Sequence, residues 1–198
     1  MMFAVSIFEA TGDAWARWRT RRLPVTPLDR VSDGTRVKIV GRVDAVARPL
    51  EAPITGRACV AWSVEVQETP GWETVLRAHE AQPLLLRDDS GRPAMVDAAR
   101  ARVLIATDET SWPLTPTARM RAFLQRHQVR ERGNYGSVRP YRYCEAAIEP
   151  GATITVVGVA RLEVDPTGMT GSYREPPIRV RFAAEARTSL WILDGSAR

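Results

Sequence analysis

The chain has 198 residues, of which 44% are hydrophobic and 26% are charged, and its formal net charge is +5. This composition allows a packed core and excludes an intrinsically disordered chain, which has fewer hydrophobic residues and a larger charge for its length. The longest apolar runs, such as residues 154–160, are far shorter than the ~18–20 residues of a transmembrane helix, so the sequence predicts a cytoplasmic protein.

The basic charge of the chain is almost all arginine, since Lys38 is the only lysine. Arginine matches the geometry of phosphate, so an arginine-rich chain is a candidate for nucleic-acid recognition. Here the arginines are spread along the whole chain instead of gathered in one basic run. That distribution favours a solvated surface, encoded by a GC-rich genome, over a nucleic-acid site.

The N-terminal region predicts a short amphipathic helix over residues 13–22, with Asp13 as its N-cap and Pro24 ending it. Trp15, Trp18 and Arg22 share one face of this helix, and Arg17 and Arg21 share another. This composition is typical of helices that lie on a membrane surface. The candidate contacts with an anionic membrane surface are therefore Trp15, Trp18, Arg17, Arg19, Arg21 and Arg22. Docking of the two tryptophans on the protein's own core is slightly favoured over membrane contact, because so short a helix buries little area in a membrane.

Most of the remaining chain alternates apolar and polar residues with the period of two that β-strands have. Pro70-Gly71 and the stretch Asp88-Asp89-Ser90-Gly91 are turn sequences, and each predicts a hairpin. The expected strands are residues 35–43, 58–67, 72–79, 83–87, 93–97, 101–106, 154–160, 178–185 and 189–193.

One helix is expected between these strands. Thr115 is a suitable N-cap, Pro116 suits the first helical position, and Gly133 suits the left-handed position after the last turn. Between them an apolar stripe at i, i+3 and i+4 is formed by Met120, Phe123 and Leu124.

Residues 33–41 can be laid over residues 150–158 without a gap, and each stretch is a Gly-containing turn that leads into a Val/Ile strand ending in glycine. Such strands, separated by a helix, suit a small and strongly bent barrel. The predicted fold is mainly β (α+β): an OB-like β-barrel with one inserted helix and a short N-terminal helix. Residues 1–29 are the predicted N-terminal extension and residues 30–198 the barrel domain.

No catalytic or metal site is expected. Cys59, Cys144, His79 and His127 are the only cysteines and histidines, and none lies within a few residues of another, whereas zinc ligands come in close pairs. Ser90 follows two aspartates, but the strand–turn–helix setting of a nucleophilic serine and the spacing of a calcium loop are both missing. The sequence therefore predicts no enzyme activity and no cofactor.

Nucleic-acid binding is an alternative, because OB-type barrels bind single strands through basic grooves and stacked aromatic side chains. The candidate ligand or nucleic-acid surface interleaves the two residue types, as Tyr135, Arg139, Tyr141, Arg142 and Tyr143. The favoured interpretation is that Tyr141 and Tyr143 alternate inward on a strand while Arg142 points to solvent, since acidic residues follow at once.

The order of the motifs resembles the GIDE family, also called BAM for "beside a membrane". Residues 41–43, 49–56 and 58–62 are similar to the opening pattern of the family. Four further elements follow in the family's order: Asp88-Asp89-Ser90-Gly91 with Val96-Asp97, the helix carrying Arg121-Ala122-Phe123-Leu124, Glu145, and Pro150-Gly151 before a Val-Val-Gly strand.

The resemblance implies a domain that works beside a membrane. In eukaryotic members it lies between transmembrane helices and precedes a RING ubiquitin-ligase domain, and bacterial relatives commonly keep the membrane segments. A RING needs about eight Cys and His ligands, whereas this sequence has two of each, so it does not support ubiquitin-ligase activity. The expected function is a non-catalytic binding or scaffold module that recruits an unidentified protein partner or lies peripherally at a membrane.

Overall fold

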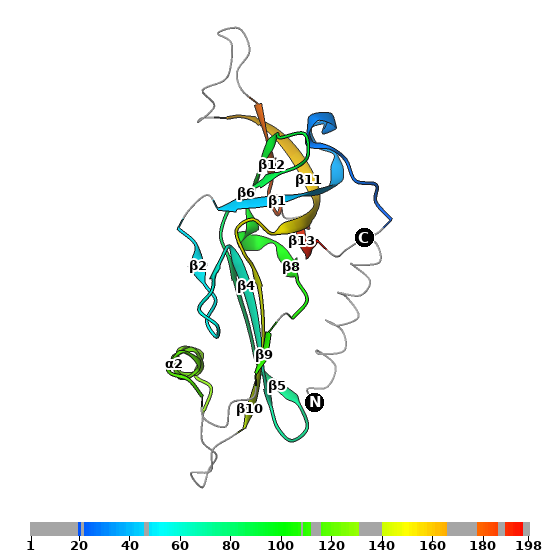
Figure 1. Ribbon diagram of the computed structural model, residues 1–198. Coiled ribbons are helices and arrows are strands. Elements are labelled where there is room, and N and C mark those ends of the chain that lie inside the picture. The colour runs from blue at the N-terminus through cyan, green and yellow to red at the C-terminus, as the bar shows by residue number, and fades with distance from the viewer. Residues whose placement is uncertain are drawn as a thin grey trace. The chain divides into compact units, whose positions relative to one another are not determined.

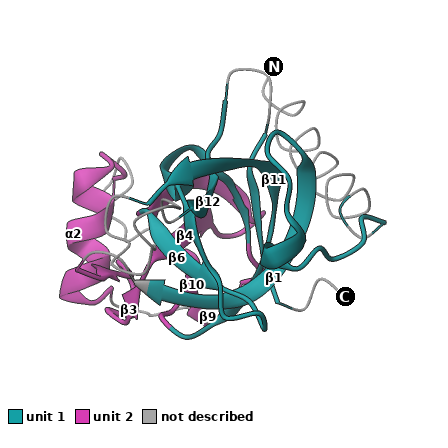
Figure 2. Ribbon diagram, turned by 90° about the horizontal axis from the view of Figure 1, so that it is seen from above, with its two compact units in different colours: residues 1–46, 83–104, 151–198 teal, residues 47–82, 105–150 magenta. Residues whose placement is uncertain are grey.

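A computed structural model describes residues 20, 22–45, 48–107, 109–111, 116–130, 140–165, 178–185 and 189–195. The chain divides into two compact units, coloured teal and magenta in Figure 2. Unit 1 comprises residues 1–46, 83–104 and 151–198, and unit 2 comprises residues 47–82 and 105–150. In the sequence, unit 2 therefore consists of two insertions into unit 1.

The described residues of unit 1 form seven strands and two short 3-10 turns (Figure 1). The strands are β1 (Arg36–Ala45), β6 (Leu84–Arg87), β7 (Pro93–Val96), β8 (Arg102–Leu104), β11 (Thr153–Val164), β12 (Ile178–Phe182) and β13 (Trp191–Asp194), and the turns are η1 (Leu28–Arg30) and η2 (Ala98–Arg100).

Five of these strands form a closed barrel in the order β1-β6-β7-β12-β11, because β11 also pairs with β1. The strands β7 and β12 run parallel, and the other pairs of the barrel are antiparallel. In chain order the barrel strands are thus arranged 1-2-3-5-4, which is the Greek-key arrangement of the OB fold. The predicted OB-like β-barrel is confirmed. The strands β13 and β8 extend the sheet from β11.

The barrel interior is filled by alternate residues of its strands, as the period-two pattern predicted. These side chains are almost wholly buried, and each contributes roughly 1.5–3 kcal/mol of hydrophobic stabilisation relative to an exposed one. The set includes Ile39, Val43, Leu84, Leu86, Val96, Val156 and Phe182.

The two similar stretches found in the sequence lie in and before β1 and β11, and these strands pair antiparallel with each other. The Gly34 N–H donates to the Ala160 carbonyl at 2.9 Å, and the Gly151 N–H donates to the Val43 carbonyl at 2.7 Å. Both glycines have positive φ, 71° and 85°, a conformation that favours glycine. The internal similarity thus corresponds to a local two-fold relation between the paired strands.

Unit 2 is an open sheet packed against a helix. Its four-stranded antiparallel sheet has the order β5-β4-β10-β9, with β4 (Ala61–Glu68), β5 (Glu73–Ala81), β9 (Glu109–Ser111) and β10 (Tyr141–Ile148). A small hairpin, β2 (Leu50–Glu51) with β3 (Ala58–Cys59), and the helix α2 (Ala118–Arg126) complete its described elements. The apolar stripe of α2 predicted from sequence packs on one face of the sheet, where Phe123 meets Trp62 edge to face at 6.0 Å between ring centroids.

The helix is shorter than the sequence suggested. Its N-cap is Thr117, whose hydroxyl accepts a hydrogen bond from the Met120 N–H at 3.3 Å. It ends at Arg126, because Gln128 takes the left-handed conformation with φ 58° and the Val129 N–H closes the last turn. The predicted cap Thr115 and the predicted terminal glycine, Gly133, lie outside the described residues.

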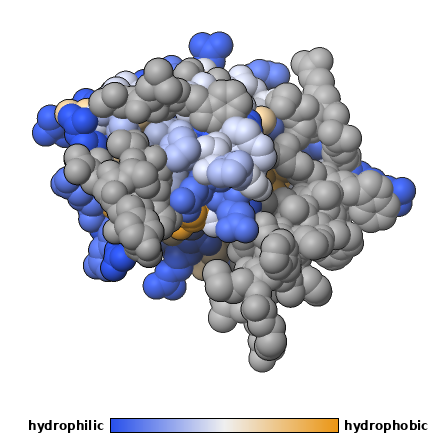
Figure 3. All heavy atoms as spheres, turned by 90° about the horizontal axis from the view of Figure 1, so that it is seen from below, coloured by the Kyte–Doolittle hydropathy of each residue, from blue (hydrophilic) through white to orange (hydrophobic). Residues whose placement is uncertain are grey.

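The assignment of residues 30–198 to one barrel domain did not distinguish unit 2, and the boundary at residue 30 stays a prediction. Of the expected helix over residues 13–22, only Thr20 and Arg22 are described. No helix in the described part of the chain combines the length and the apolar character that a membrane span requires. On the face seen in Figure 3 the described surface is mostly hydrophilic, and hydrophobic residues show only in small areas.

Candidate functional site

In OB folds the outer face of the second and third barrel strands is the usual binding surface. In this chain those strands are β6 and β7, which form a hairpin within unit 1. Leu84 and Leu86 are buried in the barrel, so the half-buried Leu85 between them lies on the outer face. By the same alternation Met95, also half-buried, lies on the outer face of β7.

The strand register places these residues in one line across the sheet, which we call the outer row. Each residue of the row is the cross-strand partner of the next, in the order Asp44, Leu85, Met95, Arg181 and Arg161. Directly opposed side chains on one face lie about 4.5–5.5 Å apart at Cβ. The outer row therefore has an apolar centre of two side chains, with a charged residue on either side.

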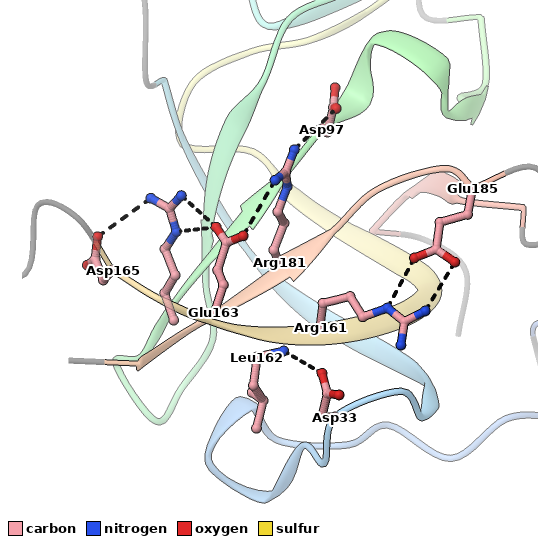
Figure 4. A network of polar contacts seen from close by, with 9 residues as sticks. Asp33, Asp97, Arg161, Leu162, Glu163, Asp165, Arg181 and Glu185 are labelled. Atoms are coloured by element: carbon pink, nitrogen blue, oxygen red, sulfur yellow. Dashed lines mark hydrogen bonds and ion pairs between the residues drawn. The ribbon is translucent and has the colours of Figure 1, made fainter. Parts of the chain in front are cut away.

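The charged side chains of the outer row itself, Asp44, Arg181 and Arg161, are paired. On the β1 side, Arg87 forms an ion pair with Asp44 at 2.6 Å. On the other side, Figure 4 shows a chain of alternating charges over β7, β12 and β11. Its members, in order, are Asp97, Arg181, Glu163, Arg179 and Asp165, with N–O distances between 2.6 and 3.8 Å.

Arg161, at the end of the outer row, pairs separately with Glu185 through two hydrogen bonds of 3.1 and 3.2 Å. The hydrogen bond and charge of Arg161 lower the pKa of Glu185, and Glu185 in turn raises the pKa of Arg161. Partial burial acts to raise the pKa of Glu163, but hydrogen bonds and charge from Arg179 and Arg181 hold it below its ordinary value. Glu163 and Glu185 are therefore ionised at neutral pH, and they neutralise the arginines that face them.

The hairpin that carries the outer row is fixed by Asp88. One oxygen of this carboxylate accepts the Ser90 N–H at 3.0 Å, and the other accepts the Leu28 N–H at 2.7 Å. Gly91, with φ 74°, closes the turn by donating to the Asp88 carbonyl. The turn predicted from sequence is confirmed, and Asp88 and Ser90 are occupied in holding it.

Unit 2 contains a polar cluster of a different kind, built on the buried carboxylate of Glu145. The side chain is fully buried and accepts hydrogen bonds from the backbone N–H of Ile54 at 2.8 Å and of Thr55 at 3.3 Å. The Thr55 hydroxyl donates to it as well, and Arg57 Nε lies 3.9 Å away. Glu145 thus anchors the loop between β2 and β3 to β10.

The same loop is closed by Gly56, which has φ 77° and donates to the Ala52 carbonyl at 2.8 Å. A Cβ at this position would lie 2.8 Å from the guanidinium carbon of Arg119. Next to the loop, burial and then the charge of Glu145 raise the pKa of Cys59 to about 11. This thiol is therefore protonated at neutral pH and unsuited to act as a nucleophile.

A comparison of the sequence with known protein families found a match. The model of the GIDE family, described as E3 ubiquitin ligase, matches residues 62–172, which is more than half of the chain. The chain belongs to the GIDE family. The matched residues begin in β4 and continue past β11, so they include strands of both units. No curated protein and no solved structure matches this GIDE chain.

The loop held by Glu145 in this GIDE chain, residues 52–57, overlaps residues 49–56, one of the stretches that carried the resemblance to the family. Sequence reasoning used Glu145 only as part of a motif and missed its role as a buried anchor. The signal was present in the alternation of β10, where Glu145 shares a face with the buried Tyr141 and Tyr143. A carboxylate in that register needs buried hydrogen-bond donors.

The burial of Tyr141 and Tyr143 contradicts the candidate nucleic-acid surface of the GIDE chain. Tyr141 and Tyr143 are 5% and 1% exposed in the core of unit 2, so they cannot stack on bases. The inward packing favoured from sequence is confirmed. Arg142 is half-buried, with its guanidinium 5.3 Å from the ring centroid of Trp72. Tyr135 and Arg139 lie outside the described residues.

Of the candidate membrane contacts, Arg22 is described and exposed. The other five, Trp15, Arg17, Trp18, Arg19 and Arg21, lie outside the described residues. Within the described part of the GIDE chain, no group of three or more His, Cys, Asp or Glu side chains is placed to hold a metal ion.

Proposed function

We propose that this GIDE chain is a non-catalytic module that recruits a partner protein through the outer face of β6 and β7. The observation that carries the proposal is the outer row, in which Leu85 and Met95 oppose each other between paired charges. A small apolar centre with a polar rim is the usual anatomy of a protein–protein interface. The GIDE barrel would present this surface at the position where OB folds bind their ligands.

The chemistry of the face favours a protein over a nucleic acid. Binding of a single strand requires unneutralised basic groups along the backbone and aromatic side chains for stacking. On this face Arg87, Arg179 and Arg181 each pair with a carboxylate. The described outward residues of β6 and β7 include no aromatic side chain.

A non-catalytic role is supported by the cysteine that lies next to the loop held by Glu145. Transfer of ubiquitin through a cysteine needs a reactive thiolate. Cys59 is fully buried and its pKa is raised, so it does not supply one. We therefore propose that any link of this chain to ubiquitin transfer is through a bound protein.

The proposal is tested by placing a photo-crosslinking amino acid at position 85 of the full chain and irradiating intact cells. We expect adducts with one or a few proteins, and we expect Met95→Asp in the same chain to remove them, because it places a charge at the apolar centre. The matched control carries the crosslinker at the exposed Ser32 of unit 1. Thermal unfolding of each variant checks that the barrel stays folded.

The outcomes separate the proposed function from its alternative. Adducts that are destroyed by nuclease would establish nucleic-acid binding in its place. Protein adducts that form equally from position 32, or that survive Met95→Asp, would show non-specific contact and overturn the assignment of this face.

Association with a membrane is a further proposal, which the family resemblance and the arginines around Arg22 support. Each basic residue near an anionic surface contributes about 1 kcal/mol, and salt screens this attraction. We expect salt-sensitive co-sedimentation of the full chain with phosphatidylserine vesicles. Replacement of Arg17, Arg19, Arg21 and Arg22 by alanine should abolish it, and equal sedimentation of both chains would refute the membrane helix.

A further inference from the structure

Unit 1 has a cavity of about 520 Å³ at the turn of the hairpin that carries the outer row. Four segments of this unit bound it: the stretch before η1, the middle of β1, the turn between β6 and β7, and the first residue of β11. Arg42 of β1 lines it, and we call it the Arg42 cavity. Its volume lies within the range of about 300–1,000 Å³ that small-molecule sites have. No residue of the outer row lines the cavity, so it is separate from the surface of the proposed function.

Two of the four charged side chains that line the Arg42 cavity are already engaged. Arg87 pairs with Asp44 at 2.6 Å, and this ion pair neutralises its charge. The carboxylate of Asp88 accepts the N–H groups of Leu28 and Ser90, one on each oxygen. Both side chains hold the barrel and its hairpin together, so neither is available to attract a ligand.

The third charged side chain, Arg42, lacks a compensating acid. It is exposed and forms no ion pair or hydrogen bond with any residue that the structure describes. Its cross-strand partner on β6 is Arg87, and like charges in this arrangement destabilise a sheet. The acid nearest in the strand, Asp44, is taken by Arg87. On the other side Arg42 is opposed by Thr153, which adds a hydroxyl group to the same part of the cavity.

The fourth charged side chain, Asp89, lies in the hairpin turn. It too is exposed and has no ion pair or hydrogen bond within the described part of the chain. The Arg42 cavity thus has one uncompensated cation on the sheet and one uncompensated anion in the turn. A simple anion bound at Arg42 would also meet the charge of Asp89, and a simple cation bound at Asp89 would meet that of Arg42.

Apolar side chains complete the lining of the cavity. They belong to Val25, Pro27 and Val40. Val25 is 54% exposed and is one of the few large hydrophobic residues that the described surface leaves open to solvent. A hydrocarbon chain that covers these side chains removes apolar surface from water, which is favourable.

The three kinds of lining assign three parts to one ligand. A guanidinium binds a carboxylate through paired N–H donors, a carboxylate accepts hydrogen bonds from an ammonium group, and the apolar wall suits methylene groups. We propose that the Arg42 cavity binds a small aliphatic zwitterion, in which a chain of methylene groups joins a carboxylate to a primary ammonium group. A single negative charge matches the one guanidinium that the barrel leaves uncompensated.

The test is a titration of the full chain with unbranched amino acids of increasing length, from glycine to 6-aminohexanoate, followed by amide NMR. Both charges of the cavity are exposed and screened by water, so we expect dissociation constants on the order of 1 mM. One chain length should bind best, because both ends of the ligand must reach their partners. The alkylamine and the alkyl carboxylate of that length each lack one charge and should bind at least about tenfold more weakly.

Variants of the chain assign each end of the ligand. In Arg42→Gln the zwitterion should bind no better than the alkylamine does, and in Asp89→Asn no better than the alkyl carboxylate. Arg42→Lys keeps the charge and should retain most of the affinity. The matched control is Arg36→Gln, which removes an exposed arginine of the same strand that does not line the cavity and should change nothing. Thermal unfolding checks that each variant is folded.

Three results would overturn the proposal. The first is absence of a saturable shift for every chain length at ~10 mM ligand. The second is binding of the alkyl carboxylate or the alkylamine as tight as that of the zwitterion, which would reveal a site for a single charge. The third is an equal loss of affinity in Arg36→Gln and Arg42→Gln, which would mean that the ligand responds to the net charge of the chain and not to this cavity.

Discussion

In unit 1 the sheet closes on itself, because β11 pairs with both β12 and β1, whereas in unit 2 the sheet is open and ends at β5 and β9. Closure satisfies the edge hydrogen bonds of the barrel strands within the unit. Within the described residues the open sheet has an edge strand at each end, and α2 packs on one of its faces. Recognition through side chains is therefore expected on the first unit, where the outer row and the Arg42 cavity lie.

The two units also differ in where they keep their charges. The ion pairs of unit 1 lie on its outer surface, where each contributes only about 0–1 kcal/mol to stability. Unit 2 buries the carboxylate of Glu145, whose hydrogen bonds come from backbone N–H groups of a loop and not from water. The most sensitive positions should therefore differ between the units. In unit 2 we expect a buried acid, and in unit 1 a position where the backbones of two barrel strands lie very close together.

The largest effect is expected at Glu145. Glu145→Ala would leave the amides of Ile54 and Thr55 without their buried acceptor and would remove the carboxylate near Arg57, and should cost about 3–5 kcal/mol. Glu145→Gln keeps an acceptor oxygen and should cost clearly less. Denaturant unfolding followed by hydrogen exchange measures the loss and assigns it to unit 2. Equal stability of the Ala and Gln variants would contradict the anchoring role.

A smaller effect is expected where the barrel strands come closest. A Cβ on Gly41 would lie 2.5 Å from the Arg87 carbonyl oxygen, a backbone atom that cannot rotate away. Gly41→Ala should therefore cost about 1–3 kcal/mol and weaken the β1–β6 pairing. Gly91→Ala is a control for backbone strain alone, because φ at Gly91 is 74° and no atom lies within 4 Å of the added carbon. Unchanged stability of Gly41→Ala would contradict a steric limit on closure.

The barrel was predictable because its information is local. Alternation in residues 35–43 and 154–160 and the turn at Asp88 to Gly91 fixed the strands and one hairpin, and the similarity of two stretches identified strands that in fact pair. The parallel pairing of β7 with β12 was not predictable, since it joins residues more than 80 positions apart. The division into two units depends on such long-range pairings.

Candidate site residues were less predictable than strands. Tyr141 and Tyr143 were suggested as a surface by their residue types and are buried by their register against β4. Leu85 and Met95 carry no signal of their own, because two half-buried apolar residues become a surface only when the strands β6 and β7 pair. The helix cap was misplaced because two threonines, Thr115 and Thr117, compete within one loop.

A third test decides which of these threonines caps α2, and the expected loss of stability is about 1 kcal/mol. Thr117→Ala removes the acceptor of the Met120 N–H and should destabilise α2 by about that amount, while Thr117→Ser should not. Thr115→Ala, which removes the cap predicted from sequence, should have a smaller effect. Hydrogen exchange of the first turn of α2 reports the difference. A larger effect at Thr115 would restore the cap predicted from sequence.

The smallest effect sharpens the contrast between the acids of the two units. Burial acts to raise the pKa of both Glu163 in unit 1 and Glu65 in unit 2, yet both pKa values lie below the ordinary 4.5. For Glu163 the lowering comes from hydrogen bonds and charge of two arginines. For Glu65 hydrogen bonds from the neutral Thr74 and Gln67 come first, ahead of the charge of Arg77.

Because each pKa is lowered on folding, each acid stabilises the protein above pH 4.5, and this contribution is lost as the pH falls from there through the lowered pKa. Salt screens charges more than it weakens neutral hydrogen bonds. Molar salt should therefore move the pKa of Glu163 toward its ordinary value more than it moves the pKa of Glu65. Carboxyl NMR titration at low and at molar salt measures both shifts. Double replacement of Arg179 and Arg181 by glutamine should remove the salt response of Glu163, whereas Arg77→Gln should change Glu65 little. An equal salt response of the two acids would contradict the proposed difference, in which charged arginines lower the pKa of Glu163 and mainly neutral hydrogen-bond donors lower that of Glu65.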